Sequence, residues 1–161
     1  MLLKYEEVTR LGDFFADRLF DLHCQLSRQN ADEWRADVIV PVPLHVDRRR
    51  ERGYNQTELI ARPLAKRLGL KVRPYLLART RPRPPRLVLS RTEHWNSVRG
   101  AYATPEGLRV DKLRILLVDD VMTTGATLDA CSRALRKAGA AEVTALTVAR
   151  VVPRWQRAPG A

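Results

Sequence analysis

The spacing of apolar positions changes along the chain, and these changes predict an alternation of helices and strands. Residues 3–28 carry apolar side chains at helical spacing, namely Leu11, Phe14, Phe15, Leu19 and Leu22. The pattern then predicts a turn at Asp32–Arg35, a strand at Asp37–Pro43, a basic loop at His45–Arg52 and a helix at Asn55–Leu68 that ends at Gly69. Pro63 lies inside this helix, so we expect a kink there or a later helix start.

The second half of the chain continues the alternation and sets the fold class. It predicts a strand at Val72–Leu77, a basic proline-rich loop at Arg79–Arg86, a short helix from Ser90 to about Val98, a strand starting at Gly100–Ala103, a strand at Leu113–Val118, a helix at Thr127–Ala138 and a last strand at Val143–Val151. The aliphatic run Leu113–Val118 is typical of a strand buried on both faces. Alternating strands and helices indicate an α/β fold, a mainly parallel twisted sheet flanked by helices. We expect one domain over residues 1–152 and a flexible tail over 153–161.

Composition narrows the class of protein. The formal net charge of +11 over 161 residues favours a polyanionic partner, either a nucleic acid or a phosphorylated small molecule. An unspecific, solvated basic surface is the alternative. No apolar run approaches the ~20 residues of a membrane span, and the N-terminus does not resemble a secretory signal. We therefore expect a cytoplasmic protein without a membrane partner. Cys24 and Cys131 form no CxxC pair, which excludes a zinc ribbon within this chain, and Cys131 is expected to pack in the core.

The stretch ILLVDDVMTTGAT, residues 115–127, carries the most specific chemistry. A buried strand runs into Asp119 and Asp120, and a Thr/Gly segment leads into the next helix. Small residues, threonine hydroxyls and the N–H groups of a helix start make an anion cradle sized for one phosphate. Two adjacent carboxylates can hold paired hydroxyls and can bind Mg²⁺ directly or through water. A surfacing strand end followed by an ordinary cap at Thr127 would explain the threonine, but not the two acids.

This stretch resembles the phosphoribosyl-diphosphate (PRPP) binding motif of type I phosphoribosyltransferases over all its 13 positions. The resemblance implies that Asp119 and Asp120 contact the ribose hydroxyls, act in catalysis and hold Mg²⁺ indirectly, through the ribose or water. It also implies a wrap around the 5′-phosphate by Thr123, Thr124, Gly125, Ala126 and Thr127. The type I phosphoribosyltransferase fold, with PRPP as donor and Mg²⁺ as cofactor, is then expected.

A second stretch, VPVPLHVDRRRERGYNQTELIA at residues 40–61, looks like the ComF family, which is associated with DNA uptake in competent bacteria. LLKYEEVTRLGDFFADRL and LSRTEHWNSVRGAYA resemble that family as well. The resemblance implies a pyrophosphate-binding loop, here with His45, Arg48, Arg49, Arg50 and Arg52. Many members carry an N-terminal zinc ribbon, and this chain is expected to be a short form without it or to have a start codon placed late.

The family also implies a flexible hood, here at about residues 79–99, whose Arg86, Arg91 and Arg99 could reach the site. Arg83 and Arg86 depart from the usual threonine and glutamine, His94 stands where arginine is common, and Ser97 stands where asparagine is common. Trp95 is expected to pack rather than stack on a base. Threonine at position 123 cannot serve as the proton acceptor of purine-salvage relatives, which argues against 6-oxopurine acceptors.

Three functions remain open from the sequence. The first is an Mg²⁺-dependent phosphoribosyltransferase that acts on an unknown nucleophilic acceptor, and a homodimer would fit type I relatives. The second is a non-catalytic competence factor that binds single-stranded DNA or competence proteins, which the basic charge and the RTRPRPPR segment motivate. The third is a regulator that binds PRPP and releases no pyrophosphate.

Overall fold

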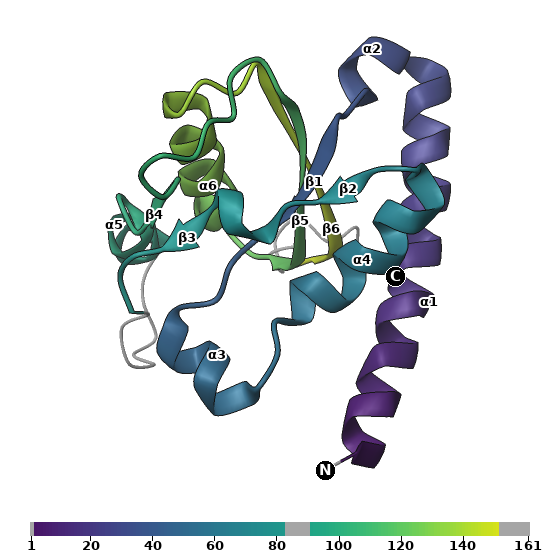
Figure 1. Ribbon diagram of the computed structural model, residues 1–161, viewed down its shortest axis with the longest axis horizontal. Helices are drawn as coiled ribbons and strands as arrows, with labels where there is room; N and C mark the ends of the chain where they lie inside the picture. The colour runs from purple at the N-terminus through teal and green to yellow at the C-terminus, as the bar shows by residue number, and fades with distance from the viewer. Residues whose placement is uncertain (1, 83–90, 152–161) are drawn as a thin grey trace, which may run out of the picture.

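A computed structural model describes residues 2–82 and 91–151 of the chain. Its centre is a four-stranded parallel sheet in the order β2-β1-β5-β6, formed by β1 (Val38–Pro41), β2 (Lys71–Val72), β5 (Arg114–Met122) and β6 (Glu142–Arg150). Helices cover both faces (Figure 1). The predicted α/β class with a mainly parallel sheet is confirmed. The expected tail at 153–161 lies outside the described residues.

The two faces of β5 bury alternate residues against different helices. Ile115 and Leu117 pack in one core cluster with Cys131 and Leu135 of α6 (Ala126–Lys137). The intervening side chains pack in the other cluster against α1 (Leu2–Gln29) and α4 (Gln56–Leu68), where Leu116, Val118, Leu19, Ile60 and Leu64 are buried. This explains the continuous aliphatic run, because a strand with period two needs apolar residues at every position when both faces are covered.

Helix α1 runs over the predicted range, but its apolar positions do not all face the core. Leu19 is buried and Phe15 packs partly against the core, whereas Leu11 and Phe14 are half exposed and Leu22 is exposed. Of these five positions, Phe15 and Leu19 therefore face the core and the other three face outward. Helix α4 starts at Gln56 with the side chain of Asn55 as its N-cap, so Pro63 delays no start.

Beside the main sheet lies a small antiparallel pair, β3 (Ala78–Arg79) and β4 (Tyr102–Ala103), with α5 (Arg91–Val98) between them in sequence. The predicted strand at Val72–Leu77 is mostly wrong, because β2 ends at Val72 and a 3₁₀ turn, η1 (Pro74–Leu76), follows. Pro74 explains the change, since a residue with a fixed φ and no N–H suits the start of a helical turn.

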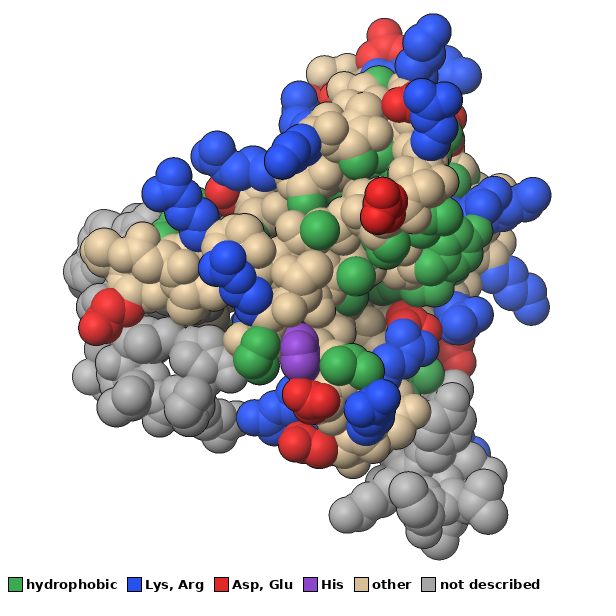
Figure 2. Space-filling view, turned by 60° about the vertical axis from the view of Figure 1, so that its left-hand side comes forward, with side chains coloured by type: hydrophobic (Ala, Val, Ile, Leu, Met, Phe, Trp, Pro, Cys, Tyr) green, Lys and Arg blue, Asp and Glu red, His purple; other side chains and the backbone are tan. Residues whose placement is uncertain are grey.

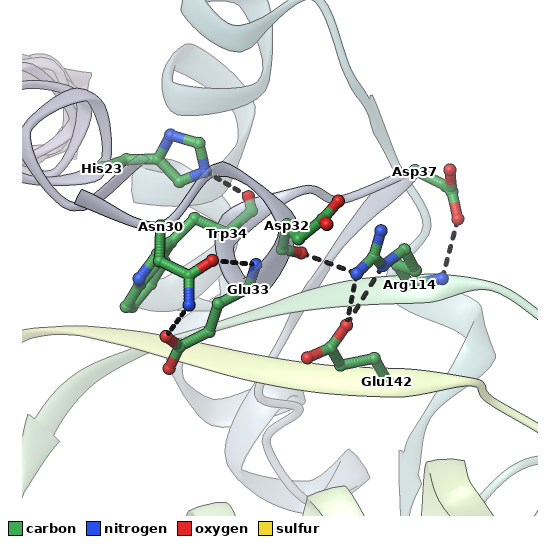
Figure 3. A network of polar contacts seen from close by, with 8 residues as sticks. All are labelled: His23, Asn30, Asp32, Glu33, Trp34, Asp37, Arg114 and Glu142. Atoms are coloured by element: carbon green, nitrogen blue, oxygen red, sulfur yellow. Dashed lines mark hydrogen bonds and ion pairs between the residues drawn. The ribbon is translucent and has the colours of Figure 1, made fainter. Parts of the chain in front are cut away.

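At the amino ends of the strands a polar network ties the helices to the sheet (Figure 3). The predicted turn at Asp32–Arg35 is instead a single helical turn, α2 (Ala31–Trp34), whose first turn the Asn30 side chain caps. Arg114 Nη2 donates to the Asp32 carbonyl oxygen at 2.6 Å and to Glu142 at 2.9 Å. The Arg114 backbone N–H donates to the Asp37 carboxylate at 2.7 Å. One arginine thus joins α2, β5 and β6.

Candidate functional site

A cavity of about 370 Å³ lies at the carboxyl ends of the central strands. The pairing of β1 with β5 ends at Pro41 and Val118, while β5 continues along β6 as far as Met122. The prediction that the strand ends before the two aspartates is therefore wrong, because the partner strand β6 keeps pairing past that point. Where β1 leaves the sheet, the chain after β1 and the aspartates of β5 wall the same cavity. This is the position at which parallel sheets of α/β proteins bind ligands.

Asp119 is a buried carboxylate without a cationic partner. Its side chain is 7% exposed, and no ion pair among the described residues includes it. Its Oδ1 accepts a hydrogen bond from the Asp120 N–H at 3.0 Å. Burial, followed by the neighbouring charge of Asp120, raises the pKa of Asp119 to about 7. The Asp119 carboxyl is therefore costly to ionise without a partner, and it lines a cavity that a ligand can enter.

The Thr/Gly segment connects β5 to the start of α6. Gly125 has φ +80° and precedes the first helical residue, a conformation that glycine adopts without strain. Thr124 Oγ1 accepts from the Ala126 N–H at 3.3 Å. Thr123 and Thr127 line the main cavity, whereas Gly125 and Ala126 line a small hollow that adjoins it. Thr127 does not cap the helix, since the N-cap is Gly125.

The predicted basic loop at His45–Arg52 is a helix, α3 (Val46–Arg52), with the ring of His45 as its N-cap. Helical spacing sorts the basic residues by face, and His45, Arg48 and Arg52 line the cavity. Arg49 instead pairs at 3.0 Å with Glu58, whose side chain is 9% exposed. Arg50 is exposed and lies outside the cavity lining. Three of the five predicted pyrophosphate-binding residues thus face the site.

Several lining residues were not expected from the sequence. Asn55 caps α4, and its Nδ2 also donates to the Val42 carbonyl oxygen at 3.1 Å, while Thr57 Oγ1 donates to the same oxygen at 2.7 Å. These bonds fasten the end of β1 to the start of α4 at the cavity wall. Arg79 and Tyr102, from β3 and β4, also line the cavity. The position of Arg79 at the start of the expected hood was the one signal available.

Arg79 and Tyr102 form a partly buried pair. Arg79 Nη1 donates to Tyr102 Oη at 2.9 Å, and the guanidinium carbon lies 5.3 Å from the ring centroid. Burial, with smaller contributions from Cys131 and Asp119, raises the pKa of Tyr102 to about 12. Burial likewise raises the pKa of the Cys131 thiol, which packs in the core as predicted. The phenol is therefore neutral at physiological pH.

The expected hood arginines are only partly placed by the structure. Arg86 lies outside the described residues, and the side chain of Arg91 does so as well. Arg99 is exposed and lines a separate groove of about 500 Å³ between α5 and α6 rather than the cavity. Trp95 packs partly against the core, as the packing interpretation predicted.

The surface is strongly basic. Figure 2 shows Lys and Arg side chains projecting around the edge of one face, with acidic side chains interspersed among them. Among residues 2–82 and 91–151, no group of three or more His, Cys, Asp or Glu side chains forms a metal cage. In the same part of the chain, no helix is both long and apolar enough to cross a bilayer.

Comparison with known proteins agrees with this geometry. Residues 55–157 match the phosphoribosyl transferase domain family. The chain is 34% identical over 119 residues to competence protein F of Haemophilus influenzae, covering 71% of this chain and 50% of that protein. It is 30% identical over 135 residues to the DNA utilization protein YhgH of Escherichia coli K12, covering 84% and 59%. The chain thus spans about half the length of these relatives.

Solved structures share the fold at lower identity. The glutamine PRPP amidotransferase of B. subtilis superposes with a TM-score of 0.51 at 22% identity, over 88% of this chain and 26% of that one. The adenine phosphoribosyltransferase of Saccharomyces cerevisiae gives 0.53 at 15% identity, over 84% and 68%. From the matched domain, the relatives and the shared fold, we conclude that this chain belongs to the phosphoribosyl transferase domain family, as a type I phosphoribosyltransferase-like protein of the ComF group.

Proposed function

We propose that the chain binds PRPP with Mg²⁺ and transfers its 5-phosphoribosyl group to a nucleophilic acceptor. The observation that carries this proposal is the meeting of three surfaces in one cavity. Asp119 and Asp120 come from β5, Thr123 comes from the following loop and Thr127 from the first turn of α6, and a cationic wall comes from α3. A ribose with a phosphate at one end and a pyrophosphate at the other matches this order of hydroxyl acceptors, phosphate cradle and cations.

The volume and charge of the cavity suit such a ligand. About 370 Å³ lies within the range of small-molecule sites. His45, Arg48 and Arg52 offer guanidinium and imidazole groups to a leaving pyrophosphate on the face of α3 that lines the cavity. The carboxylates of Asp119 and Asp120 accept hydrogen bonds from the 2′- and 3′-hydroxyls, and they favour positive charge that develops on the sugar. Asn55 and Thr57 hold the cavity wall in place.

In the proposed reaction the lone pair of the acceptor attacks the anomeric carbon. The bond from that carbon to the pyrophosphate oxygen breaks, pyrophosphate leaves with the bonding pair, and the acceptor loses a proton to solvent. The α3 cations offset the charge that gathers on the leaving group, so positioning and electrostatics provide the catalysis.

Mg²⁺ fits this set of residues in the way that it is bound beside phosphates, through one or two carboxylates with the remaining ligands from substrate and water. Asp119 and Asp120 are the carboxylates that line the cavity, and they would hold the ion indirectly. When bound, the ion would neutralise pyrophosphate charge.

Calorimetric titration of Mg²⁺-PRPP into the wild type and Asp119→Asn/Asp120→Asn tests the proposal. The double variant should bind roughly a hundredfold more weakly, because two charged acceptors of hydroxyl bonds are lost. Asp129→Asn, on α6 outside the main cavity lining, should bind like the wild type. If the wild type shows no measurable binding at millimolar Mg²⁺-PRPP, the proposal is wrong. A screen for pyrophosphate release with a panel of bases and amines separates a transferase from a PRPP-sensing regulator.

A second candidate function rests on the groove between α5 and α6. Trp95, Arg99, Arg133 and Lys137 line it, and cations beside an aromatic ring suit single-stranded DNA. The relatives named for DNA utilization and competence favour this function too. Binding should weaken steeply with salt, and failure to bind single-stranded DNA at ~50 mM salt would remove it.

A further inference from the structure

Arg79 lines the cavity from a different part of the fold than the helix that would hold pyrophosphate. It lies in β3, directly across from Tyr102 in the antiparallel pair. Tyr102, Val98 and Ser97 line the cavity near Arg79, whereas His45, Arg48 and Arg52 come from α3 and its N-cap. The helices and strands concerned lie apart in Figure 1, with α3 below the sheet edge and β3, β4 and α5 grouped together.

The guanidinium of Arg79 is fixed by two contacts and has one nitrogen to spare. Nε donates to the Arg81 carbonyl oxygen at 2.9 Å, and Nη1 donates to Tyr102 Oη at 2.9 Å. Nη2 is buried and has no hydrogen-bond partner among the described residues. None of the ion pairs in this part of the chain includes Arg79. A buried charged donor without a partner is costly, so a ligand oxygen at this point would be strongly favoured.

The surroundings of Nη2 indicate which ligand supplies that oxygen. A pyrophosphate carries several charges and needs several cations, which α3 provides on its own wall. Beside Arg79 the wall is instead Tyr102 and Val98, a ring and an aliphatic side chain that suit a planar organic molecule. The two N–H groups of Nη2, held in one orientation, match one carboxylate.

We propose that Arg79 is the specificity-determining residue for the acceptor and that the acceptor is a planar molecule bearing a carboxylate. This inference rests on the proposed function, because it takes the second ligand of the cavity to be the acceptor of the phosphoribosyl group. A site with a buried, unpaired donor discriminates strongly against analogues that lack the matching acceptor atom. Carboxylated compounds should therefore bind more tightly than their uncharged counterparts.

Matched pairs of probes test the inference, with orotate against uracil and anthranilate against aniline, titrated with and without Mg²⁺-PRPP. The wild type should prefer the carboxylate member of at least one pair by at least roughly tenfold. Arg79→Met should abolish that preference and leave Mg²⁺-PRPP binding within about threefold of the wild type. Arg81→Met is the matched control, since it removes an exposed arginine two residues away and should leave the preference intact. Arg79→Lys should restore part of the preference, because it retains the charge without the planar fork.

Each outcome bears on one proposal or the other. No preference for a carboxylate in either pair, or a preference that survives in Arg79→Met, overturns the acceptor assignment. A tenfold loss of inorganic pyrophosphate or Mg²⁺-PRPP binding in Arg79→Met also overturns it, since Arg79 would then serve the donor. If the wild type binds no Mg²⁺-PRPP but Arg79→Met loses the carboxylate preference, the acceptor site stands and the proposed transferase function fails.

Discussion

Strand β5 carries a charged residue near each end, and the two ends differ in how those charges are compensated. At the amino end, Arg114 donates to Glu142 at 3.1 and 2.9 Å and to the Asp32 carbonyl oxygen at 2.6 Å (Figure 3). At the carboxyl end, the buried Asp119 has a backbone N–H as its partner and Asp120 as its neighbour. Two like charges lie together at one end, and opposite charges are paired at the other.

The difference assigns separate roles to the two edges of the sheet. Paired groups at the amino edge lower the free energy of the folded chain and need nothing further. Uncompensated groups at the carboxyl edge, Asp119 and the spare Nη2 of Arg79, raise it and leave contacts for a ligand to complete. Changes at the amino edge should therefore alter stability and leave binding unchanged, whereas changes at the carboxyl edge should alter binding, together with stability where they remove an uncompensated group.

The largest expected effect on stability is at Arg114. Arg114→Met should lower the free energy of unfolding by about 2 kcal/mol, because charge-assisted bonds that join α2, β5 and β6 are lost at a site that is only partly exposed. Urea unfolding followed by circular dichroism measures this. Arg109→Met removes a surface pair of an arginine whose side chain is 87% exposed and should change stability negligibly. Weakened Mg²⁺-PRPP binding in Arg114→Met would contradict the division between the two edges.

At the carboxyl edge, Asp119 should make stability depend on pH in the unusual direction. Its folded pKa of about 7 exceeds the unfolded value of 3.8, so the folded state keeps a proton that the unfolded state has released. The contribution of Asp119 to stability therefore rises as pH falls from 8 towards 5, by at most about 1.4 kcal/mol per pH unit. Asp119→Asn should remove this slope and be about 1–2 kcal/mol more stable than the wild type at pH 8.

Unfolding of both proteins between pH 5.5 and 8 isolates the contribution of Asp119 from that of the histidines, which both share. Stability curves that run parallel for the wild type and Asp119→Asn would contradict this prediction. They would show that ionising the Asp119 carboxylate costs no more in the folded state than in the unfolded state. Mg²⁺-PRPP binding, which needs the ionised form, should weaken in the wild type as pH falls below about 7. Stability and binding thus respond to pH in opposite directions.

The sequence was sufficient for the α/β class and for the buried strand that carries the two aspartates, but not for the edge strand β2, most of whose predicted range is not a strand. Ile115–Val118 needed burial on both faces, and the Thr/Gly segment between β5 and α6 had few local alternatives. The antiparallel pair β3–β4 was harder to predict, because strands of two residues carry no measurable periodicity. Pro74 is compatible with an edge strand and with a 3₁₀ turn, and tertiary packing decided between them.

Within the site, it was easier to predict that the residues after β1 are basic than to predict which of them face the cavity. The basic residues after β1 were recognised, but their helical arrangement was not, because six charged residues in α3 mask any apolar period. Arg49 could not be separated from Arg48 without knowing that Glu58 is buried beside it. The role of Arg79 depends on the contact with Tyr102, 23 residues away in sequence, which no local pattern reports.

Arg48 and Arg49 provide a sharper test of the carboxyl edge. Arg48→Met should weaken Mg²⁺-PRPP and pyrophosphate binding roughly tenfold, because it removes a cation from the cavity wall. Arg49→Met should leave binding unchanged, since Arg49 is held by Glu58, and it should cost stability by less than ~1 kcal/mol because Arg62 still pairs with that carboxylate. Calorimetry on both variants decides, and equal losses of affinity would mean that α3 acts through its total charge.

The smallest effect is expected at Tyr102, where the two kinds of role meet. Tyr102→Phe removes the oxygen that accepts from Arg79 Nη1 but keeps the ring under the guanidinium. Since the phenol has a pKa of about 12, no charge is lost near neutral pH, and the free energy of unfolding should fall by ~1 kcal/mol or less. Carboxylate probes should bind about two- to fivefold more weakly, because Arg79 is less firmly oriented.

The same titrations of orotate and uracil measure this change, and Tyr75→Phe, at an exposed tyrosine, is the control. Unchanged orotate binding in Tyr102→Phe, with lost binding in Arg79→Met, would mean that the cation alone selects the acceptor. A loss in Tyr102→Phe as large as in Arg79→Met would instead make the phenol itself a ligand contact. The expected intermediate result would mean that the bond to the neutral phenol contributes part of the positioning of Arg79. That bond would then be the point at which stability and specificity are coupled.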